Sequence, residues 1–344
     1  MFNGAASLPQ CLRALAESRY APAECIVVDD GSTDDSALIA RQSGAEVVST
    51  GGRFGPARAR NLGARKAQGD LLLFVDADVA LDAHALERIA ERFERDHDLD
   101  ALIGSYDDSP ADPGLISQFK NLMHAFVHHG GNRQAFTFWC GCGAVKREVY
   151  LAHGGLDESY RQPSIEDIEF GFRMMKSGRK LELDPEVHCK HLKVWTLGKL
   201  VYTDVFQRGI PWTELILRTG FFADDLNLRK SQRISVLLAG LLALLCGAGI
   251  WQTAAGTVLM PGYVVAASAA ICLLAIGFIN RAFYGFLASR KGWAFTLAAF
   301  PLHILYFFYS GVSFVMGAGA YFLRTVPPPA PSKDMPPSQV QDQP

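Results

Sequence analysis

The 344-residue sequence predicts an α/β domain with a doubly wound, mainly parallel sheet, followed by a C-terminal region of transmembrane helices. Two observations lead to this prediction. Short apolar runs alternate with amphipathic segments in the first two thirds, and charge nearly disappears after residue 233. Residues 1–233 hold 28 basic and 33 acidic residues, whereas residues 234–344 hold 5 and 2. A net charge of −2 excludes a strongly basic nucleic-acid-binding protein.

The expected elements of the soluble part follow one another as strand and helix. Strands are predicted over 25–28, 46–49, 71–75 and 101–105, and helices over 56–67 and 83–94. A further helix should follow Ser32, because Asp35 stands at the capping-box spacing from it. Continuous apolar strands that alternate with helices favour a buried parallel sheet with helices on both faces.

Acidic residues follow two of these strands directly. Asp29 and Asp30 end the first run, and Asp76 and Asp78 end the run over 71–75. In open α/β sheets, ligands bind at the carboxyl ends of the strands. Carboxylates one residue apart can share one Mg²⁺ or Mn²⁺ ion, which would neutralise charge on a departing diphosphate. Each pair alone is also typical of a turn that caps a helix, and only their combination favours a binding site.

A third acidic cluster opens another predicted helix. Glu166 and Asp167 follow Ser164, again at capping-box spacing. A carboxylate at a helix N-terminus is stabilised in its ionised form and can accept a proton from a hydroxyl group. A plain capped helix start remains an alternative. Downstream, His188 and His191 follow an alternating stretch over 181–187, and either imidazole could reach a metal ion.

The motifs VVDDGSTD at 27–34, ARNLGA at 59–64, GD at 69–70, FVDAD at 74–78, GGLDE at 154–158 and EDIE at 166–169 resemble those of family 2 glycosyltransferases with the GT-A fold. The resemblance covers roughly residues 2–193. It implies an inverting transfer of a sugar from a nucleotide-diphosphate sugar, dependent on Mg²⁺ or Mn²⁺.

The resemblance also implies roles for single residues. Asp29 and Asp30 would hold the nucleoside, and Arg60 would lie near the nucleotide or its diphosphate. Asp76 would contact the diphosphate as well as the metal. These four residues form the expected nucleotide site.

The same resemblance implies the metal ligands and the catalytic pair. Asp76, Asp78 and His191 would hold the metal, with His188 kept as an alternative to His191. Asp167 would be the catalytic base, and Glu166 would stand beside it.

The sequence departs from the family pattern at two places. Residues 1–4 read MFNG and lie inside a motif that usually follows a first apolar strand, so we expect that the native start lies upstream of Met1 or that the chain is a fragment. Residues 207–212 read QRGIPW, which only partly matches the Gln-x-x-Arg-Trp signature of processive synthases. Long-chain polymerisation is therefore not expected.

The C-terminal third contains three uncharged apolar runs, over 234–251, 253–280 and 294–323, each long enough to cross a bilayer. Buried core helices are the alternative. We expect a GT-A-like domain over 1–195, an interfacial connector over 196–233, about three transmembrane helices over 234–323 and a disordered Pro-rich tail over 324–344. Basic residues around 229–233 and 281–291 predict a cytosolic catalytic domain on the inner membrane, with the tail outside.

The sequence thus predicts a membrane-anchored glycosyltransferase. The expected partners are a nucleotide-diphosphate sugar, a lipid or saccharide acceptor and the membrane, with no nucleic acid. Two alternatives remain open: a nucleotidyltransferase of similar fold, and a truncated membrane scaffold without catalytic activity.

Overall fold

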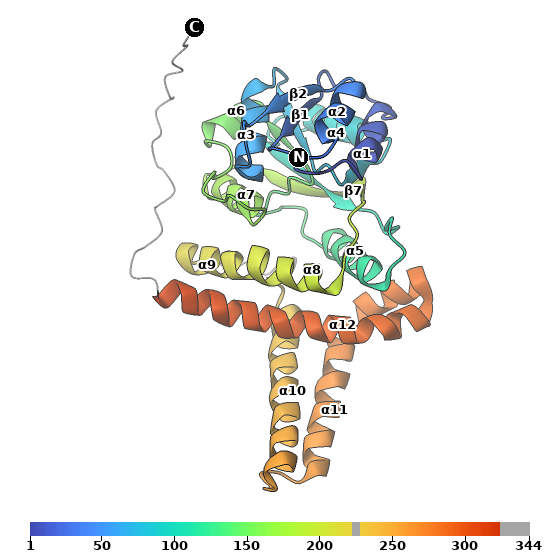
Figure 1. Cartoon of the computed structure of the whole chain (residues 1–344), viewed down its shortest axis with the longest axis vertical. Coiled ribbons are helices and arrows are strands. Elements are labelled where there is room, and N and C mark those ends of the chain that lie inside the picture. Colours follow the sequence, from blue (N-terminus) through green and yellow to red (C-terminus); the bar gives the residue numbers. More distant parts are fainter. Residues whose placement is uncertain (222–227, 324–344) are drawn as a thin grey trace.

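The computed structural model describes residues 1–221 and 228–323. The predicted tail over 324–344 lies outside the described residues, as does part of the predicted connector. An α/β domain rests on a layer of helices, and the hairpin of α10 and α11 projects from that layer away from the domain (Figure 1).

The N-terminal part of the domain is built on a small parallel sheet. Strands β1 and β2 pair in register, with Ile26 opposite Glu46. The backbone of Met1 lies beside β1, because its amine donates to the Val28 carbonyl oxygen at 2.5 Å and its carbonyl oxygen accepts from Asp30 N–H at 2.8 Å. The elements of this part are α1 (Leu8–Ala16), β1 (Ile26–Asp29), α2 (Ser36–Gln42), β2 (Glu46–Ser49) and α3 (Pro56–Lys66).

The second sheet has five strands in the order β3-β6-β5-β7-β4. These are β3 (Leu71–Val75), β4 (Val79–Leu81), β5 (Ala101–Tyr106), β6 (Cys142–Lys146) and β7 (Leu181–His191). Strand β5 runs parallel to β7, while β3–β6, β5–β6 and β4–β7 are antiparallel. The predicted α/β class is confirmed, but the prediction of a mainly parallel sheet is wrong. Strands buried on both faces are apolar throughout in either direction, so the sequence does not reveal their polarity.

Helices cover both faces of this sheet and enclose two cores. One core packs Leu72 and Phe138 against α6 and α7, and the other packs Leu102 against α4 and α5. The helices are α4 (Ala85–Arg95), α5 (Leu115–His129), α6 (Arg147–Ala152) and α7 (Glu166–Lys176). Because helices pack on both faces of the sheet, they fix the strand ends that carry the acidic residues.

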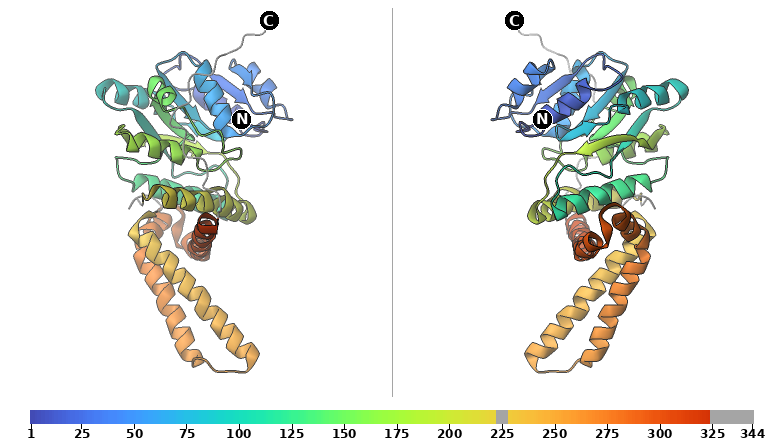
Figure 2. Two further views of the ribbon diagram at one scale, coloured as in Figure 1. Left: turned by 90° about the vertical axis from the view of Figure 1, so that its left-hand side faces the viewer. Right: turned by 90° about the vertical axis from the view of Figure 1, so that its right-hand side faces the viewer.

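The C-terminal region is helical throughout its described residues. It comprises α8 (Leu197–Tyr202), the π-helix η1 (Thr203–Gly209), α9 (Ile210–Thr219), α10 (Lys230–Ala255), α11 (Gly262–Ile279) and α12 (Arg281–Leu323). Three of these, α10, α11 and α12, are long and apolar enough to cross a membrane. Helix α12 is kinked at Gly292, where φ is +80°, and then runs across the base of the domain under α8 and α9 (Figures 1 and 2).

Candidate active site

Two of the predicted nucleotide-site residues stand at the end of β1, where their side chains have different tasks. Asp29 accepts a hydrogen bond from Ser32 N–H at 3.0 Å and stabilises the turn that follows the strand. Asp30 is buried, and its carboxylate accepts from Phe54 N–H at 3.0 Å and from Gly55 N–H at 2.8 Å. Its carboxylate therefore organises the loop between β2 and α3 that borders the site.

Gly55 is required where this loop meets the next wall of the site. Its φ is +101°, and a Cβ atom there would lie 2.5 Å from the carbonyl oxygen of Arg161. The loop after β2 and the loop before α7 therefore touch through backbone. This contact brings the nucleotide-side loop close to the segment that carries Glu166 and Asp167.

Arg60 links the acidic residues of β3 and α7. Its guanidinium donates to Asp76 Oδ1 at 2.7 Å and to Glu166 Oε1 at 2.8 Å. Burial opposes the charge of Arg60, but the neighbouring Cys140 thiol and carboxylates keep its pKa well above the usual value. Residues separated by about 100 positions in the chain thus form one ion-pair network, and Glu166, which is buried, is fully engaged in it.

Asp167 is the second residue of α7 and is the less buried of the two adjacent acids. Its carboxylate accepts from Cys140 N–H at 3.2 Å and from Ile168 N–H at 2.8 Å. Burial and the charge of Glu166 raise the pKa of Asp167 to about 6, despite the opposing charge of Arg60. A carboxyl group with a pKa near 6 is a good proton acceptor at neutral pH.

Asp78 and His191 lie close together on the other side of the site. His191 Nε2 is 3.7 Å from Asp78 Oδ2, and His191 Nδ1 contacts Asn121 Oδ1 at 2.8 Å. An Nδ1–H donated to Asn121 leaves the Nε2 lone pair facing Asp78, an arrangement typical of metal-binding histidines. Burial would raise the pKa of Asp78, but when His191 is protonated on both ring nitrogens its hydrogen bond and charge lower that pKa. His188, the alternative histidine, instead lies beside His129, with ring centres 5.7 Å apart.

Asp78 and His191 therefore fit a divalent cation as a carboxylate–imidazole pair. The three predicted ligands do not gather, however. Within residues 1–221 and 228–323, no group of three His, Cys, Asp or Glu side chains is placed to hold a metal. Asp76 does not lie with Asp78 and His191 as expected of a shared metal site, because its carboxylate is paired with the guanidinium of Arg60.

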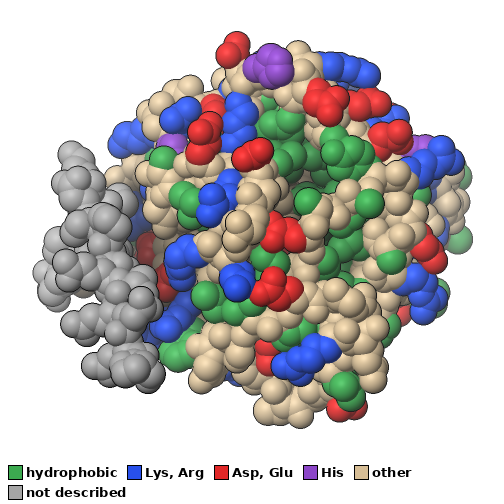
Figure 3. Space-filling model, turned by 90° about the horizontal axis from the view of Figure 1, so that it is seen from above, with side chains coloured by type: hydrophobic (Ala, Val, Ile, Leu, Met, Phe, Trp, Pro, Cys, Tyr) green, Lys and Arg blue, Asp and Glu red, His purple; other side chains and the backbone are tan. Residues whose placement is uncertain are grey.

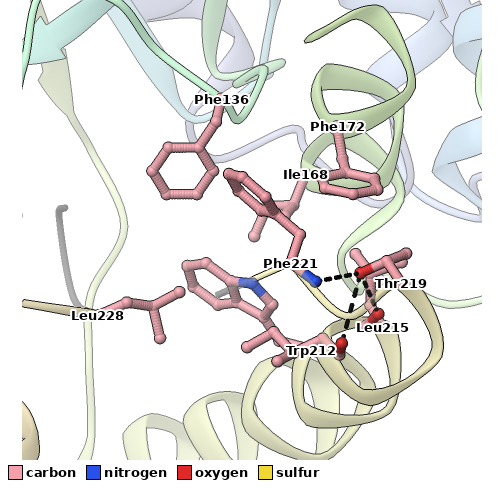
Figure 4. A pocket seen from close by; sticks show the side chains of 9 residues that line it. Phe136, Ile168, Phe172, Trp212, Leu215, Thr219, Phe221 and Leu228 are labelled. Atoms are coloured by element: carbon pink, nitrogen blue, oxygen red, sulfur yellow. Dashed lines mark hydrogen bonds between the residues drawn. The ribbon is translucent and has the colours of Figure 1, made fainter. Parts of the chain in front are cut away.

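An apolar pocket begins directly beside Glu166 and Asp167. Ile168, next to Asp167, lines it together with Phe136 and Trp212 (Figure 4). The Phe221 ring closes one side, with centre-to-centre distances of 5.7 Å to Phe136 and 5.1 Å to Phe172. The pocket lies between α7 and α9.

Several residues of the site have no signal in the sequence pattern. Asn61 joins α3 to the GGLDE motif, because its amide donates to Leu156 O at 2.8 Å and its oxygen accepts from Tyr150 at 2.6 Å. Asn121 orients His191 from the buried face of α5. An isolated asparagine in an amphipathic helix gives no indication of its partner, so only the motif spacing around Asn61 could have suggested its role.

Comparison with known proteins identifies the class of this domain. Residues 1–154 match the family model described as Glycosyl transferase family 2. These residues are therefore similar to family 2 of the glycosyltransferases, in agreement with the motifs and with the mixed α/β fold. The domain carries the acidic strand ends and Arg60, whereas Asp167 and His191 lie beyond the matched range.

Two curated relatives and one solved structure illustrate the likeness. An uncharacterised glycosyltransferase of Haemophilus influenzae is 26% identical over 51% of this chain and 60% of its own length. The undecaprenyl-phosphate 4-deoxy-4-formamido-L-arabinose transferase of Sodalis glossinidius is 25% identical over 43% of this chain and 48% of its own length. The mannosyltransferase of Pyrobaculum calidifontis, in complex with GDP-Man and Mn²⁺, gives a TM-score of 0.49 at 18% identity, covering 94% of this chain and 85% of that one. The chain thus spans about half the length of the curated relatives it matches.

Proposed function

We propose that this protein is a membrane-anchored inverting glycosyltransferase. It moves a sugar from a nucleotide-diphosphate sugar to an acceptor with a lipid part. The accepting group is a hydroxyl group or the P–OH group of a phosphate. The observation that carries the proposal is the position of Asp167. It lies between an ion-pair network that contains Arg60 and an apolar pocket that begins at Ile168. A polar donor side and an apolar acceptor side therefore meet at one proton acceptor.

The proposed reaction uses Asp167 as the base. The acceptor oxygen attacks the anomeric carbon, the bond from that carbon to the diphosphate breaks, and the hydroxyl proton passes to the Asp167 carboxylate. Arg60 offsets part of the charge of Asp76 and Glu166 on the donor side. Positioning and charge stabilisation supply most of the rate enhancement in such a site.

A divalent cation fits this proposal at Asp78 and His191. When bound, Mg²⁺ or Mn²⁺ would neutralise charge on the departing nucleoside diphosphate. Asn121 holds the imidazole so that Nε2 faces Asp78, and Asp76 remains a proposed ligand with Arg60 bound at its Oδ1. Asp29 and Asp30 remain the proposed nucleoside-side residues, with Asp30 acting through the loop that it organises.

Positive charge near Asp78 supports a phosphate-bearing substrate. Burial lowers the pKa of the Lys193 amine, Asp78 opposes this shift, and the charge of Arg208 on η1 adds to it. Two cations therefore stand close to the acidic strand end. A polyisoprenoid-type lipid phosphate is compatible with these charges. The Sodalis relative, which by its name transfers a sugar to undecaprenyl phosphate, supports the same acceptor class.

The test is a donor screen in membranes that contain the full chain. Each nucleotide sugar is supplied with a radiolabelled sugar and Mn²⁺ or Mg²⁺, and label is followed into the organic phase. We expect chloroform-soluble label together with released nucleoside diphosphate, both lost in Asp167→Asn and retained in the surface variant Glu91→Gln. Label only in water-soluble saccharide would overturn the lipid acceptor.

The same assay separates the two alternatives. A nucleotidyltransferase releases no nucleoside diphosphate from a nucleotide sugar, but releases inorganic diphosphate when a nucleoside triphosphate and a sugar phosphate are supplied instead. A scaffold without catalytic activity releases neither with any donor, acceptor extract or metal, and that result contradicts the proposal as a whole.

A further inference from the structure

The third apolar helix, α12, touches the α/β domain and its connector along its whole length. Its first part packs Phe283 and Leu287 against Phe119 and Leu122 of α5. Its middle is joined to η1, because Tyr309 donates a hydrogen bond to Asp204 Oδ2 at 2.7 Å. Contacts to the globular part of the protein are therefore not confined to one end of the helix.

The last part of α12 continues the same contact along α9. A Cβ atom on Gly317 would lie 2.7 Å from the Cβ of Thr213 and 2.9 Å from the carbonyl oxygen of Ile210. A Cβ on Gly209 would likewise lie 2.7 Å from the Cβ of Ser313. Glycines at both positions allow the two helices to approach closely, and this close packing extends almost to the end of α12.

These contacts are incompatible with a membrane-crossing α12. Tyr309 stands at the midpoint of the uncharged run 294–323, so a spanning helix would carry it to the bilayer centre. Its partner Asp204 is bound through both carboxylate oxygens to Lys120 of α5, at 2.8 Å each. A spanning α12 would therefore either lose this bond or draw an ion pair of the α/β domain into hydrocarbon, where charged side chains are costly.

The outer face of α12 is apolar and has no partner among the described residues. Leu297, Val315 and Phe322 are about 70% exposed, and Phe308 is 41% exposed. Their spacing of 11, 7 and 7 residues places them on one face of the helix. The opposite face of the molecule, remote from the hairpin, shows interspersed acidic and basic side chains (Figure 3).

We propose that α12 lies along the membrane surface with this outer face in lipid, and that the chain crosses the bilayer only twice, through α10 and α11. The lipid bilayer is the occupant of the face because α12 crosses the hairpin where both of its helices reach the helical layer (Figure 1). The exposed apolar surfaces of α10 and α11 thus continue into that of α12.

The charge distribution fits crossings through α10 and α11, and it is the same whether or not α12 also crosses. Basic residues precede α10 at 229–233 and follow α11 at 281–291, while the turn over 256–261 between the two helices has no charged residue. Two crossings place both basic clusters on one side, as the positive-inside rule requires. Arg290 is tied to Asp108 of the α/β domain at 2.8 Å, which fixes the start of α12 on the domain side. Leu323 then lies on the side of the catalytic domain.

Short epitope tags test the topology in the full chain. One tag follows Pro344, a second precedes Met1, and a third is inserted after Leu259 in the α10–α11 turn. Protease is added to sealed right-side-out and inverted membrane vesicles. We expect the first two tags to be cleaved in inverted vesicles and the third in right-side-out vesicles. Cleavage of the C-terminal tag together with the α10–α11 tag overturns the proposal.

Depth-dependent quenching tests the position of α12 itself. Phe308→Cys and, as a matched control on α10, Leu244→Cys each receive a fluorophore in a Cys246→Ser background, because Cys246 is the exposed native cysteine. The protein is reconstituted in vesicles of phosphatidylethanolamine and phosphatidylglycerol with nitroxide lipids. We expect shallow nitroxides to quench position 308 more strongly and deep nitroxides to quench position 244 more strongly. Stronger deep quenching at both positions means that α12 spans the bilayer.

Discussion

Two clusters of buried opposite charges, built with the same chemistry, have different consequences for the protein. In the active-site cluster, Arg60 faces both Asp76 and Glu166, and Asp167 stands nearby. In the junction cluster, Lys120 faces Asp204 alone. The first cluster has more acids than bases, whereas the second is balanced.

The difference shows that an excess of acidic side chains distinguishes the proposed reactive site from the structural one. Asp167 has no cation of its own, and this favours its protonated form. Burial and the charge of Glu166 raise its pKa to about 6. Asp204, in contrast, has both oxygens bound to Lys120 and receives a further hydrogen bond from Tyr309. Such a fully hydrogen-bonded carboxylate holds helices together.

The largest expected effect comes from removing the surplus acid. Asp167→Asn should lower the transfer rate by about 10²- to 10⁴-fold, the contribution typical of a general base. Nucleoside diphosphate release at saturating donor measures this loss. A variant that retains more than a tenth of the wild-type rate would remove Asp167 from the role of base.

The same variant should not be less stable at neutral pH. Because the folded-state pKa of Asp167 lies above its ordinary value of 3.8, the folded protein holds the proton more tightly than the unfolded chain between pH 4 and 6. The resulting stabilisation is present below pH 4 and is lost as the pH rises through 6. Asn at this position does not lose this stabilisation, so the free energy of unfolding of the variant should exceed that of the wild type by at most about 3 kcal/mol at pH 7.5. Thermal unfolding in detergent checks the sign.

The second prediction breaks the balanced cluster. Lys120→Met leaves Asp204 buried without its cation and should destabilise the protein by about 3 to 5 kcal/mol. Lys120→Met with Asp204→Leu should recover most of this loss, since both charges are then absent. Arg95→Met serves as the control, because the Arg95–Glu91 pair is largely exposed and should contribute less than about 1 kcal/mol. An equal loss in Lys120→Met and Arg95→Met would contradict the contrast between buried and exposed pairs.

The third prediction concerns the pH dependence of the active-site cluster. In the wild-type protein, kcat/KM should fall as the pH decreases through about 6, because Asp167 gains a proton and ceases to act as a base. Arg60→Met removes a charge that lowers the pKa of Asp167, so the acidic limb should move upward by about one pH unit or more. A limb that stays in place in Arg60→Met would mean that another group controls it.

The sequence predicts much of the active-site cluster but not the junction cluster. Asp76, Glu166 and Asp167 stand in motifs, and their places at a strand end and a helix start follow from local patterns. Their pairing through Arg60 depends on two elements about 100 residues apart, and no spacing rule reveals such a distance. The helices of the C-terminal third were predicted from apolar length. Their direction was not, because hydropathy is the same for a helix in a membrane and a helix on its surface.

The junction cluster had no sequence signal at all. Lys120 lies in an amphipathic helix, Asp204 in a connector and Tyr309 in an apolar run, and each residue is unremarkable in its own segment. They meet because a π-helical turn over Thr203–Gly209 lies between α5 and α12. Tertiary contact, and not local pattern, creates this site.

The smallest expected effect also connects the two clusters. Tyr309→Phe removes one hydrogen bond to a buried carboxylate and should cost about 1.5 kcal/mol, since Lys120 still balances Asp204. Transfer activity should fall little at low temperature but be lost a few degrees earlier on heating. That loss should follow because η1, which Tyr309 anchors, also accepts a hydrogen bond at Gln207 O from Ser164 Oγ, 2.9 Å away, just before Glu166. The matched change Tyr202→Phe, at an exposed residue of α8, should leave both midpoints unchanged. If Tyr309→Phe lowers the unfolding midpoint no more than Tyr202→Phe does, α12 is not held to the domain through Asp204, and the two clusters act independently.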